Sequence, residues 1–219
     1  MQYYQKINSI FLRDPENNMK TFLYGHYSIP EFEYLKDAIW THTEKVDGTS
    51  IVVSFEKDKL VVGGHTEVSQ IPPFVLKTIN DLLLPQMEKL QKMFPTQSPV
   101  YFYGEGYGPK VNKKGKLYRE DHGFVMFDVF INDLWLAREN VEDIGNKLGI
   151  DVVPIIGYGT LDDAIIKTKA GFKSQWGDFI AEGIVAKPKV ELQCRRGSRI
   201  ITKVKYKDFT KESGTTGML

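Results

Sequence analysis

Short runs of β-branched and aromatic residues, each bounded by a turn, recur along this 219-residue chain. The clearest pair is Ile51–Phe55 and Leu60–Gly64, which flank the charged turn Glu56–Lys59 and so predict a hairpin. Further strands are predicted at Trp40–Lys45, Val100–Gly106, Phe124–Ile131, Val152–Ile156, Glu182–Ala186 and Ile200–Tyr206. Because helical segments separate these runs, we expect an α+β fold of antiparallel sheets flanked by helices.

Helical periodicity is most regular between residues 73 and 94, where apolar side chains recur at steps of three or four. Pro85 falls inside this pattern, so we expect a kink or two consecutive helices. Two more helices are predicted at Arg138–Leu148 and Leu161–Lys169. Residues 1–40 are interpreted as an irregular, partly helical lead-in, in which Pro30 suits a first helical turn.

Charge and composition restrict the classes of function. A hydrophobic content of 42% is ample for one domain, which we expect over residues 1–210, with 211–219 as a flexible tail. The net charge is only +1, so binding of a polyanion requires a local basic patch. The single Cys194 excludes an intramolecular disulfide, and no apolar run reaches the length of a membrane span. We therefore expect a cytoplasmic protein (host cytoplasm if phage-encoded) that has no membrane partner.

The stretch Thr43–Ser50 (TEKVDGTS) is the first candidate for chemistry. It places Lys45 between the carboxylates of Glu44 and Asp47, and Gly48 directly follows Asp47. A lysine amine becomes a nucleophile when desolvation or a second cation lowers its pKa. The alternative interpretation is an ordinary exposed turn.

Two further clusters lie in the middle of the chain. Glu105 stands among glycines in the segment YGEGYG, where a backbone can approach a ligand closely. Phe127 precedes Asp128 and offers a ring on which a base can stack. The alternatives are a solvated loop acid for Glu105 and a core side chain for Phe127.

The last two clusters lie near the C-terminus. Glu182 is a carboxylate at an apolar strand and needs a cation or metal if it is buried. Lys203 and Lys205 are two residues apart, hence on one strand face. A surface position for Glu182, and the polar face of a half-buried strand for the two lysines, remain open alternatives.

In this order the clusters resemble motifs I, III, IIIa, IV and V of the ATP-dependent polynucleotide ligases, within the covalent nucleotidyltransferase superfamily. The resemblance covers residues 40–207 and is closest to RNA ligases of the phage nick-sealing and trypanosome-editing type. Glu182 lies 5 residues before Lys187 and 21 before Lys203, as in that branch. The resemblance implies an ATP-dependent RNA ligase that forms lysyl-AMP, transfers AMP to a 5′-phosphate end and seals that end to a 3′-hydroxyl. RNA ends, including those of nicked duplexes, are the implied partners, with an accessory RNA-binding protein as an optional one.

The resemblance also implies roles for individual residues. Lys45 would be the nucleophile, and Glu182 would hold Mg²⁺, the implied cofactor besides ATP. Phe127 would stack on the adenine. Contacts to ATP or AMP are implied for Thr43, Glu44, Val46, Asp47, Gly48, Ser50, His65, Glu105, Phe127, Glu182, Lys187, Lys203 and Lys205. The basic loop Pro109–Arg119 is a candidate grip on the strand backbone, with a solvated charged loop as the alternative.

Two positions depart from the family pattern. His65 stands where related ligases usually have Arg, and a histidine lacks the guanidinium fork. Ser50 stands where Asn is common. Both positions are tied in the family to handling nucleic-acid ends. With 14 residues after Lys205 (219 less 205), we expect no C-terminal OB-fold or helical domain.

Three rival functions share parts of this pattern. A minimal ATP-dependent DNA ligase has every motif, and a capping guanylyltransferase would use GTP. A ligase-like module that binds nucleotide or RNA ends without sealing them is the third.

Overall fold

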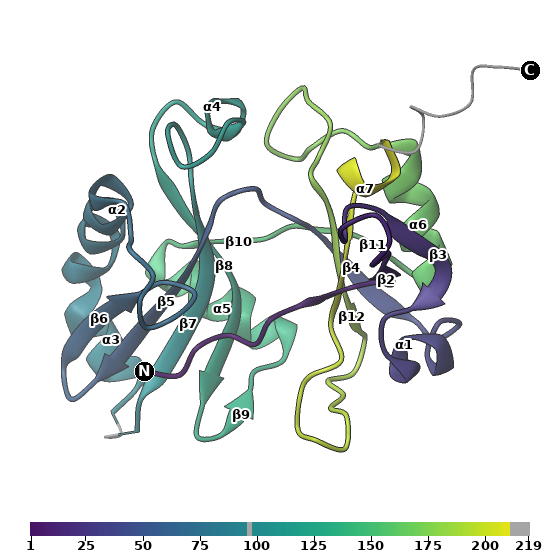
Figure 1. Ribbon diagram of the computed structural model, residues 1–219. Helices are drawn as coiled ribbons and strands as arrows, with labels where there is room; N and C mark the ends of the chain where they lie inside the picture. Colours follow the sequence, from purple (N-terminus) through teal and green to yellow (C-terminus); the bar gives the residue numbers. More distant parts are fainter. Residues whose placement is uncertain (96–97, 211–219) are drawn as a thin grey trace, which may run out of the picture. The chain divides into compact units, whose positions relative to one another are not determined.

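The computed structural model describes residues 1–95 and 98–210 and divides the chain into two compact units (Figure 1). Unit 1 comprises Met1–Tyr4 and Val46–Val153. Unit 2 comprises Gln5–Lys45 and the chain from Pro154 onward. The predicted flexible tail at 211–219 lies outside the described residues, and the assignment of 1–210 to one nucleotidyltransferase domain stays a prediction.

Unit 1 is built on a six-stranded sheet in the order β10-β8-β7-β5-β6, with β9 paired to β8. Its pairings are antiparallel except the short parallel pair β10–β8. The predicted hairpin is confirmed, because positive φ at Lys57 (49°) and Asp58 (59°) gives the tight turn between β5 and β6. The strands are β5 (Thr49–Glu56), β6 (Lys59–Gly63), β7 (Val100–Tyr107), β8 (Gly123–Ile131), β9 (Leu134–Trp135) and β10 (Asp151–Val152).

Helices cover one face of the unit 1 sheet, and aromatic rings occupy the other. Buried residues of α2, α3 and α5 pack with alternate residues of β5, β7 and β8 in one core cluster. The intervening residues, such as Tyr103 and Phe130, form a second, smaller cluster with Tyr4 and Trp135. As the pattern predicted, Pro85 separates two helices, and it lies in a 3₁₀ turn, η1. The helical segments are α2 (Pro73–Leu83), η1 (Leu84–Gln86), α3 (Met87–Met93), α4 (Gly115–Tyr118) and α5 (Arg138–Leu148).

Unit 2 is built on a five-stranded sheet in the order β1-β13-β12-β4-β11, and a separate hairpin pairs β2 with β3. Apart from the parallel β1–β13 pair, its pairings are antiparallel. Helix α6 supplies Leu161, Ala164 and Ile165 to the core, and Thr160 and Asp163 form a capping box at its start. The elements are β1 (Asn8–Ser9), β2 (Phe11–Arg13), β3 (Phe22–Tyr27), α1 (Pro30–Tyr34), β4 (Trp40–Glu44), β11 (Ile155–Gly159), α6 (Leu161–Ala170), β12 (Gly183–Pro188), β13 (Thr202–Lys205) and α7 (Lys207–Thr210).

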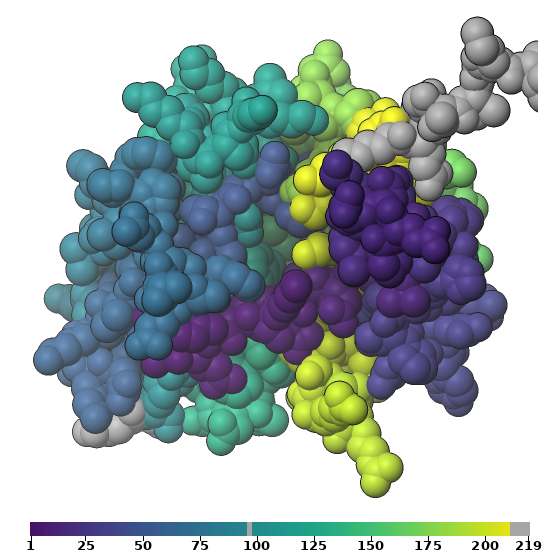
Figure 2. All heavy atoms as spheres, viewed as in Figure 1, coloured from purple at the N-terminus to yellow at the C-terminus, as the bar shows by residue number. Residues whose placement is uncertain are grey.

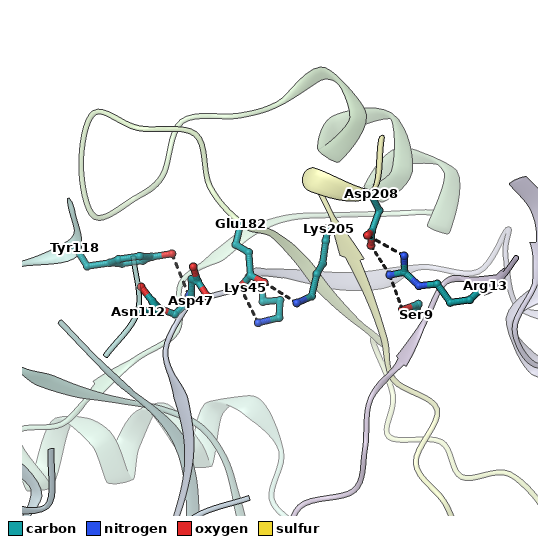
Figure 3. A network of polar contacts seen from close by, with 9 residues as sticks. All are labelled: Ser9, Arg13, Lys45, Asp47, Asn112, Tyr118, Glu182, Lys205 and Asp208. Atoms are coloured by element: carbon teal, nitrogen blue, oxygen red, sulfur yellow. Dashed lines mark hydrogen bonds and ion pairs between the residues drawn. The ribbon is translucent and has the colours of Figure 1, made fainter. Parts of the chain in front are cut away.

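An ion pair joins the two ends of unit 2. The guanidinium of Arg13 in β2 donates two hydrogen bonds to the buried carboxylate of Asp208 in α7, at 2.9 and 2.7 Å (Figure 3). The same guanidinium lies over the ring of Phe22, 4.2 Å from its centroid. A planar guanidinium suits both contacts, so this pair fixes the β2–β3 hairpin to the last described helix.

Two expectations from the sequence are wrong. The single strand predicted at Val152–Ile156 is two strands, β10 and β11, which belong to different sheets. The lead-in over residues 1–40 contains three strands besides its short helix, although Pro30 does occupy the first helical turn. None of the helices in the described ranges combines the length and apolar character needed to cross a bilayer.

Candidate active site

The unit 2 sheet has one apolar face and one face that carries lysines. Directly paired residues on adjacent strands project to the same face of a sheet. Val185 in β12 pairs with Thr43 on one side and Lys203 on the other, and Gly183 pairs with Lys205. The lysine-bearing face therefore includes Thr43, Val185, Lys187, Lys203 and Lys205.

The opposite face of the same strands is the core. Ile184, Ala186 and Val204 are buried there against α6. The prediction that Lys203 and Lys205 share one strand face is thus confirmed by the register of β13 with β12.

Lys45 lies directly after β4, at the end of the first segment of unit 2. Its backbone N–H donates to the carbonyl of Gly183, at 2.9 Å. Its amine donates to Oε2 of Glu182 at 2.8 Å, and the amine of Lys205 lies 2.8 Å from Oε1 of the same carboxylate (Figure 3). The side chains of Lys45 and Glu182 are 19% and 12% exposed, so the group is reachable from solvent while largely desolvated.

The charges in this cluster perturb one another. Burial raises the pKa of Glu182, but the charge of Lys45 and the hydrogen bond and charge of Lys205 outweigh it, leaving the pKa below 4.5. Burial lowers the pKa of Lys203, and the charges of Lys205, Lys45 and Lys6 lower it further against the opposing effect of Glu182. Three ammonium groups, those of Lys45, Lys203 and Lys205, act on one carboxylate and leave an excess of positive charge, which suits an anionic ligand.

Glu44 occupies the opposite side of β4 from Thr43. Its carboxylate is 1% exposed and accepts hydrogen bonds from Ser174 Oγ at 2.6 Å and from the N–H of Gln175 at 2.8 Å. Burial raises its pKa, and these two hydrogen bonds counteract part of the rise. The Glu44 side chain thus binds Ser174 and Gln175 in the segment after α6. Only the backbone of Glu44 is then left for its predicted contact with ATP or AMP, and that contact stays a prediction.

The segment after Lys45 belongs to unit 1 and runs close to β7. Val46 is buried, and Ser50 pairs with Glu105 across β5 and β7, which places both on one face. A Cβ on Gly48 would lie 2.3 Å from the carbonyl oxygen of Gly106 and 2.7 Å from Cγ of Glu105. Only glycine fits at position 48, and this close approach sets the residue after Asp47 directly against Glu105 in unit 1.

Phe127 is placed by a β-bulge. The register between β7 and β8 shifts from Tyr103↔Asp128 to Gly104↔Met126, so Phe127 is the extra residue. Its ring is half-buried and meets Tyr4 edge to face at 5.1 Å between centroids. The hydroxyl of Tyr4 also donates to the buried carboxylate of Asp128, at 2.5 Å. Phe127 is therefore partly core, as one alternative held, and still has an exposed part.

His65 follows β6 in an exposed loop. The N–H of Thr66 donates to Ser69 Oγ, and a second hydrogen bond joins the hydroxyls of the same two residues. The pairing of β5 with β6 ends at Val52 and Gly63, two residues short of Ser50 and His65. The predicted contact of His65 with ATP stays a prediction.

The structure therefore collects the predicted site residues into two sets. Unit 2 brings together Thr43, Lys45, Glu182, Lys187, Lys203 and Lys205. Unit 1 carries Asp47, Gly48, Ser50, Glu105 and Phe127, and the chain passes from one set to the other at Lys45–Val46. Four residues that the sequence did not single out contact them: Tyr4, Asn112, Tyr118 and Ser174. No local pattern marks these four, because each contacts a residue 65 or more positions away in the chain.

The side chains that could ligate a metal are sparse. Over residues 1–95 and 98–210, no three His, Cys, Asp or Glu side chains cluster as a metal site would require. Glu182 is the one predicted ligand, and both of its oxygens accept from lysines. Mg²⁺ is often held by one or two carboxylates together with phosphates and waters, so this acid fits a metal that a phosphate ligand also binds.

The comparisons with known proteins agree with this geometry. Residues 38–205 match the model of the RNA ligase family, and the chain belongs to that family. A comparison with curated proteins gives no match.

Among solved structures, the chain is similar to the RNA ligase of Naegleria gruberi. The form of that ligase with PPi has a TM-score of 0.63 and 19% identity, over 94% of this chain and 58% of that one. A mutant with ATP and Mn has a TM-score of 0.64 and 18% identity, over 84% of this chain and 54% of that one. These matches show the fold, which consists of mainly antiparallel sheets flanked by helices. This chain spans a little over half the length of the Naegleria ligase.

Proposed function

We propose that this chain is an ATP-dependent RNA ligase whose Lys45 accepts AMP from ATP and passes it to an RNA end. The observation that carries the proposal is the cluster in which the Lys45 amine lies 2.8 Å from Glu182, beside Lys205 and Lys203. Membership in the RNA ligase family supports it, and so do the forms of the Naegleria ligase with ATP and Mn, with AMP and Mn, and with PPi.

In the first step, the deprotonated amine of Lys45 attacks the α-phosphorus of ATP. An N–P bond forms, the bond from that phosphorus to the bridging oxygen breaks, and pyrophosphate leaves with the bonding pair. Lys203 and Lys205 lie on the same sheet face and stabilise the negative charge of the transferring and leaving phosphates. The proton that Lys45 must lose is directed in the structure at Glu182.

A divalent metal, when bound, neutralises charge on the phosphate oxygens, and Glu182 is the residue that would hold it. The residues proposed to bind the base and the ribose belong to unit 1. There Phe127 offers a ring face for the adenine, and Glu105 and Asp47 offer carboxylates for the ribose hydroxyls.

In the later steps, a 5′-phosphate oxygen of RNA attacks the lysyl-AMP phosphorus and releases the Lys45 amine. A 3′-hydroxyl then attacks the 5′-phosphorus, a phosphodiester forms, and AMP leaves. RNA ends, and RNA nicks in particular, are the proposed substrates.

The test is incubation of the protein with α-labelled ATP and Mg²⁺, followed by denaturing electrophoresis. Wild type should retain label on the chain, and Lys45→Ala should retain none. Lys77→Ala, which removes an exposed lysine of α2, is the matched control and should label as wild type does. Absence of label on wild type, or equal label on Lys45→Ala, contradicts the proposal.

Three further measurements separate the rivals. A nicked duplex with RNA or DNA on the 3′-hydroxyl side distinguishes an RNA ligase from a DNA ligase. Retention of ATP without a covalent adduct would instead identify a module that binds nucleotide without chemistry, and labelling by GTP alone would identify a guanylyltransferase.

A further inference from the structure

Both backbone groups of Asp47 are held by side chains from one distant loop of unit 1. The N–H of Asp47 donates to the hydroxyl of Tyr118 at 3.1 Å, and Nδ2 of Asn112 donates to the carbonyl of Asp47 (Figure 3). Asp47 stands two residues after Lys45 and precedes Gly48, which is itself confined against β7. The position of this segment therefore depends on where Asn112 and Tyr118 lie.

These two side chains belong to the basic loop Pro109–Arg119, which is tightly built. Oδ1 of Asn112 accepts from the N–H of Lys114 at 3.1 Å, so its amide links Asp47 to the start of α4. Gly115 lies so close to the carbonyl of Gly108 that a Cβ on it would be 1.7 Å from that oxygen. Tyr118 is buried edge to face on Tyr107, with centroids 5.9 Å apart. A shift of the loop would thus be transmitted to Asp47 rather than absorbed within the loop.

The outer side of the same loop is strongly positive. Residues 110–117 contain four lysines (Lys110, Lys113, Lys114 and Lys116) and no acidic residue, and all four are exposed. Arg119 is different, because it forms an ion pair with Asp121. The loop carrying α4 reaches the surface at the top of the space-filling view (Figure 2). In a chain whose net charge is only +1, this is a local patch suited to phosphates.

We propose that the basic loop binds RNA phosphates through its lysines and that Asn112 and Tyr118 couple this binding to the position of Asp47. Phosphates bound along the lysines restrict the loop, so the two hydrogen bonds to Asp47 are formed for a larger fraction of time. The segment next to the nucleophile is then ordered before AMP transfer, which lowers the entropic cost of that step. Asn112 and Tyr118 are positioning residues in this scheme, and the coupling is reciprocal. The inference rests on the proposed function for its substrate.

The direct test is hydrogen exchange at the Asp47 amide, measured by NMR with and without a nicked RNA duplex bearing a 5′-phosphate. In wild type the duplex should slow this exchange at least ~10-fold, since a held amide exchanges only on local opening. Tyr118→Phe, which keeps the ring and removes the acceptor, should exchange fast with or without RNA. Lys113→Ala/Lys114→Ala/Lys116→Ala should weaken RNA binding and lower its salt slope by about 2–3.

Steady-state measurements provide the second readout. Asn112→Asp retains an acceptor for Lys114 but sets a carboxylate against the Asp47 carbonyl. The rate of AMP transfer at saturating RNA should therefore fall, with thermal stability unchanged, and the affinity for RNA should fall only by the factor, about 10-fold, by which RNA slows exchange at Asp47. Lys77→Ala on α2 is the control and should match wild type in every assay. A purely structural role for Asn112 would instead lower thermal stability and affinity together.

Several outcomes overturn the inference. In the first, RNA binds wild type without slowing hydrogen exchange at Asp47. In the second, the triple lysine variant binds RNA with unchanged affinity and salt slope. In the third, wild type does not bind RNA. Equal transfer rates in Tyr118→Phe and wild type overturn it as well. Failure of the proposed function is seen separately, as absence of label from ATP on wild type, because the exchange measurement requires no adduct.

Discussion

The two units use sheets of similar size for different chemistry. In unit 2, α6 closes one face of the sheet, and the other face carries three lysines. One of them, Lys205, shares the carboxylate of Glu182 with Lys45. In unit 1, three helices close one face, and the other carries the rings of Tyr4, Phe127 and their neighbours. Cations attract phosphates from any direction, whereas a ring binds a base only through its face. Under the proposed function, this contrast predicts that unit 2 sets the rate of phosphoryl transfer and that unit 1 sets the choice and affinity of the nucleotide.

The largest effects should come from the two cores, because each unit has its own. Leu83→Ala in unit 1 and Leu161→Ala in unit 2 each remove a fully buried side chain and should each lower the free energy of unfolding by about 2–5 kcal/mol. Calorimetry distinguishes two possibilities. If each substitution lowers only one of two transitions, the units unfold separately. If both lower the same single transition, the division into units has no thermodynamic counterpart.

Glu182→Gln tests the charge cluster of unit 2. Loss of the carboxylate removes the anionic partner of two lysines, and adduct formation with labelled ATP should slow by about 10²- to 10³-fold. The lowered pKa of Glu182 means that its ion pairs stabilise the fold at neutral pH and are lost only as the pH falls below 4.5. The stability difference between wild type and Glu182→Gln should accordingly shrink in acid. A difference that is unchanged down to pH 3 would show that the pairs contribute nothing.

Phe127→Ala tests the ring face of unit 1. Removal of a stacking ring should weaken ATP binding by about 1–3 kcal/mol, or roughly 5- to 150-fold in Kd. The maximal rate of adduct formation should change far less, and Phe127→Tyr should restore most of the affinity. A fall in rate at saturating ATP with unchanged affinity would reverse the division of labour between the units.

Ser174→Ala should have the smallest effect, about 1 kcal/mol on stability at neutral pH, through one hydrogen bond to the buried Glu44. The substitution removes a contact that lowers the pKa of Glu44, so that pKa rises further. Since a raised carboxyl pKa costs stability only above the unfolded value, the part of the defect that comes from Glu44 should diminish as the pH falls toward 4.5. Ser54→Ala, which removes an exposed hydroxyl contact of 3.5 Å, is the control and should be neutral at both pH values.

Local patterns in the sequence predicted the regular elements well. The helix at Arg138–Leu148 has the predicted bounds, and Pro85 divides its helical segment as its missing N–H requires. The prediction of a single strand at Val152–Ile156 was wrong because periodicity identifies extended chain without identifying the partner strand. Its two halves pair with β8 in one sheet and β4 in another, and the chain changes unit at Val153–Pro154.

The site was predictable where spacing alone fixes a side chain. Two lysines two positions apart must share a strand face, as Lys203 and Lys205 do. The same alternation separates Glu44 from Thr43, which a list of motif residues does not show. Ser174, Asn112 and Tyr118 were missed because a hydrogen bond across 65 or more positions leaves no trace in local sequence.

The fit of Gly48 against β7 has a consequence for directed evolution of this chain. Because even a methyl group there would overlap the Gly106 carbonyl, every mutant at this codon must displace main chain next to Asp47. A library that randomises positions 47–50 in search of altered nucleotide choice will therefore yield active clones only where the codon for Gly48 is kept.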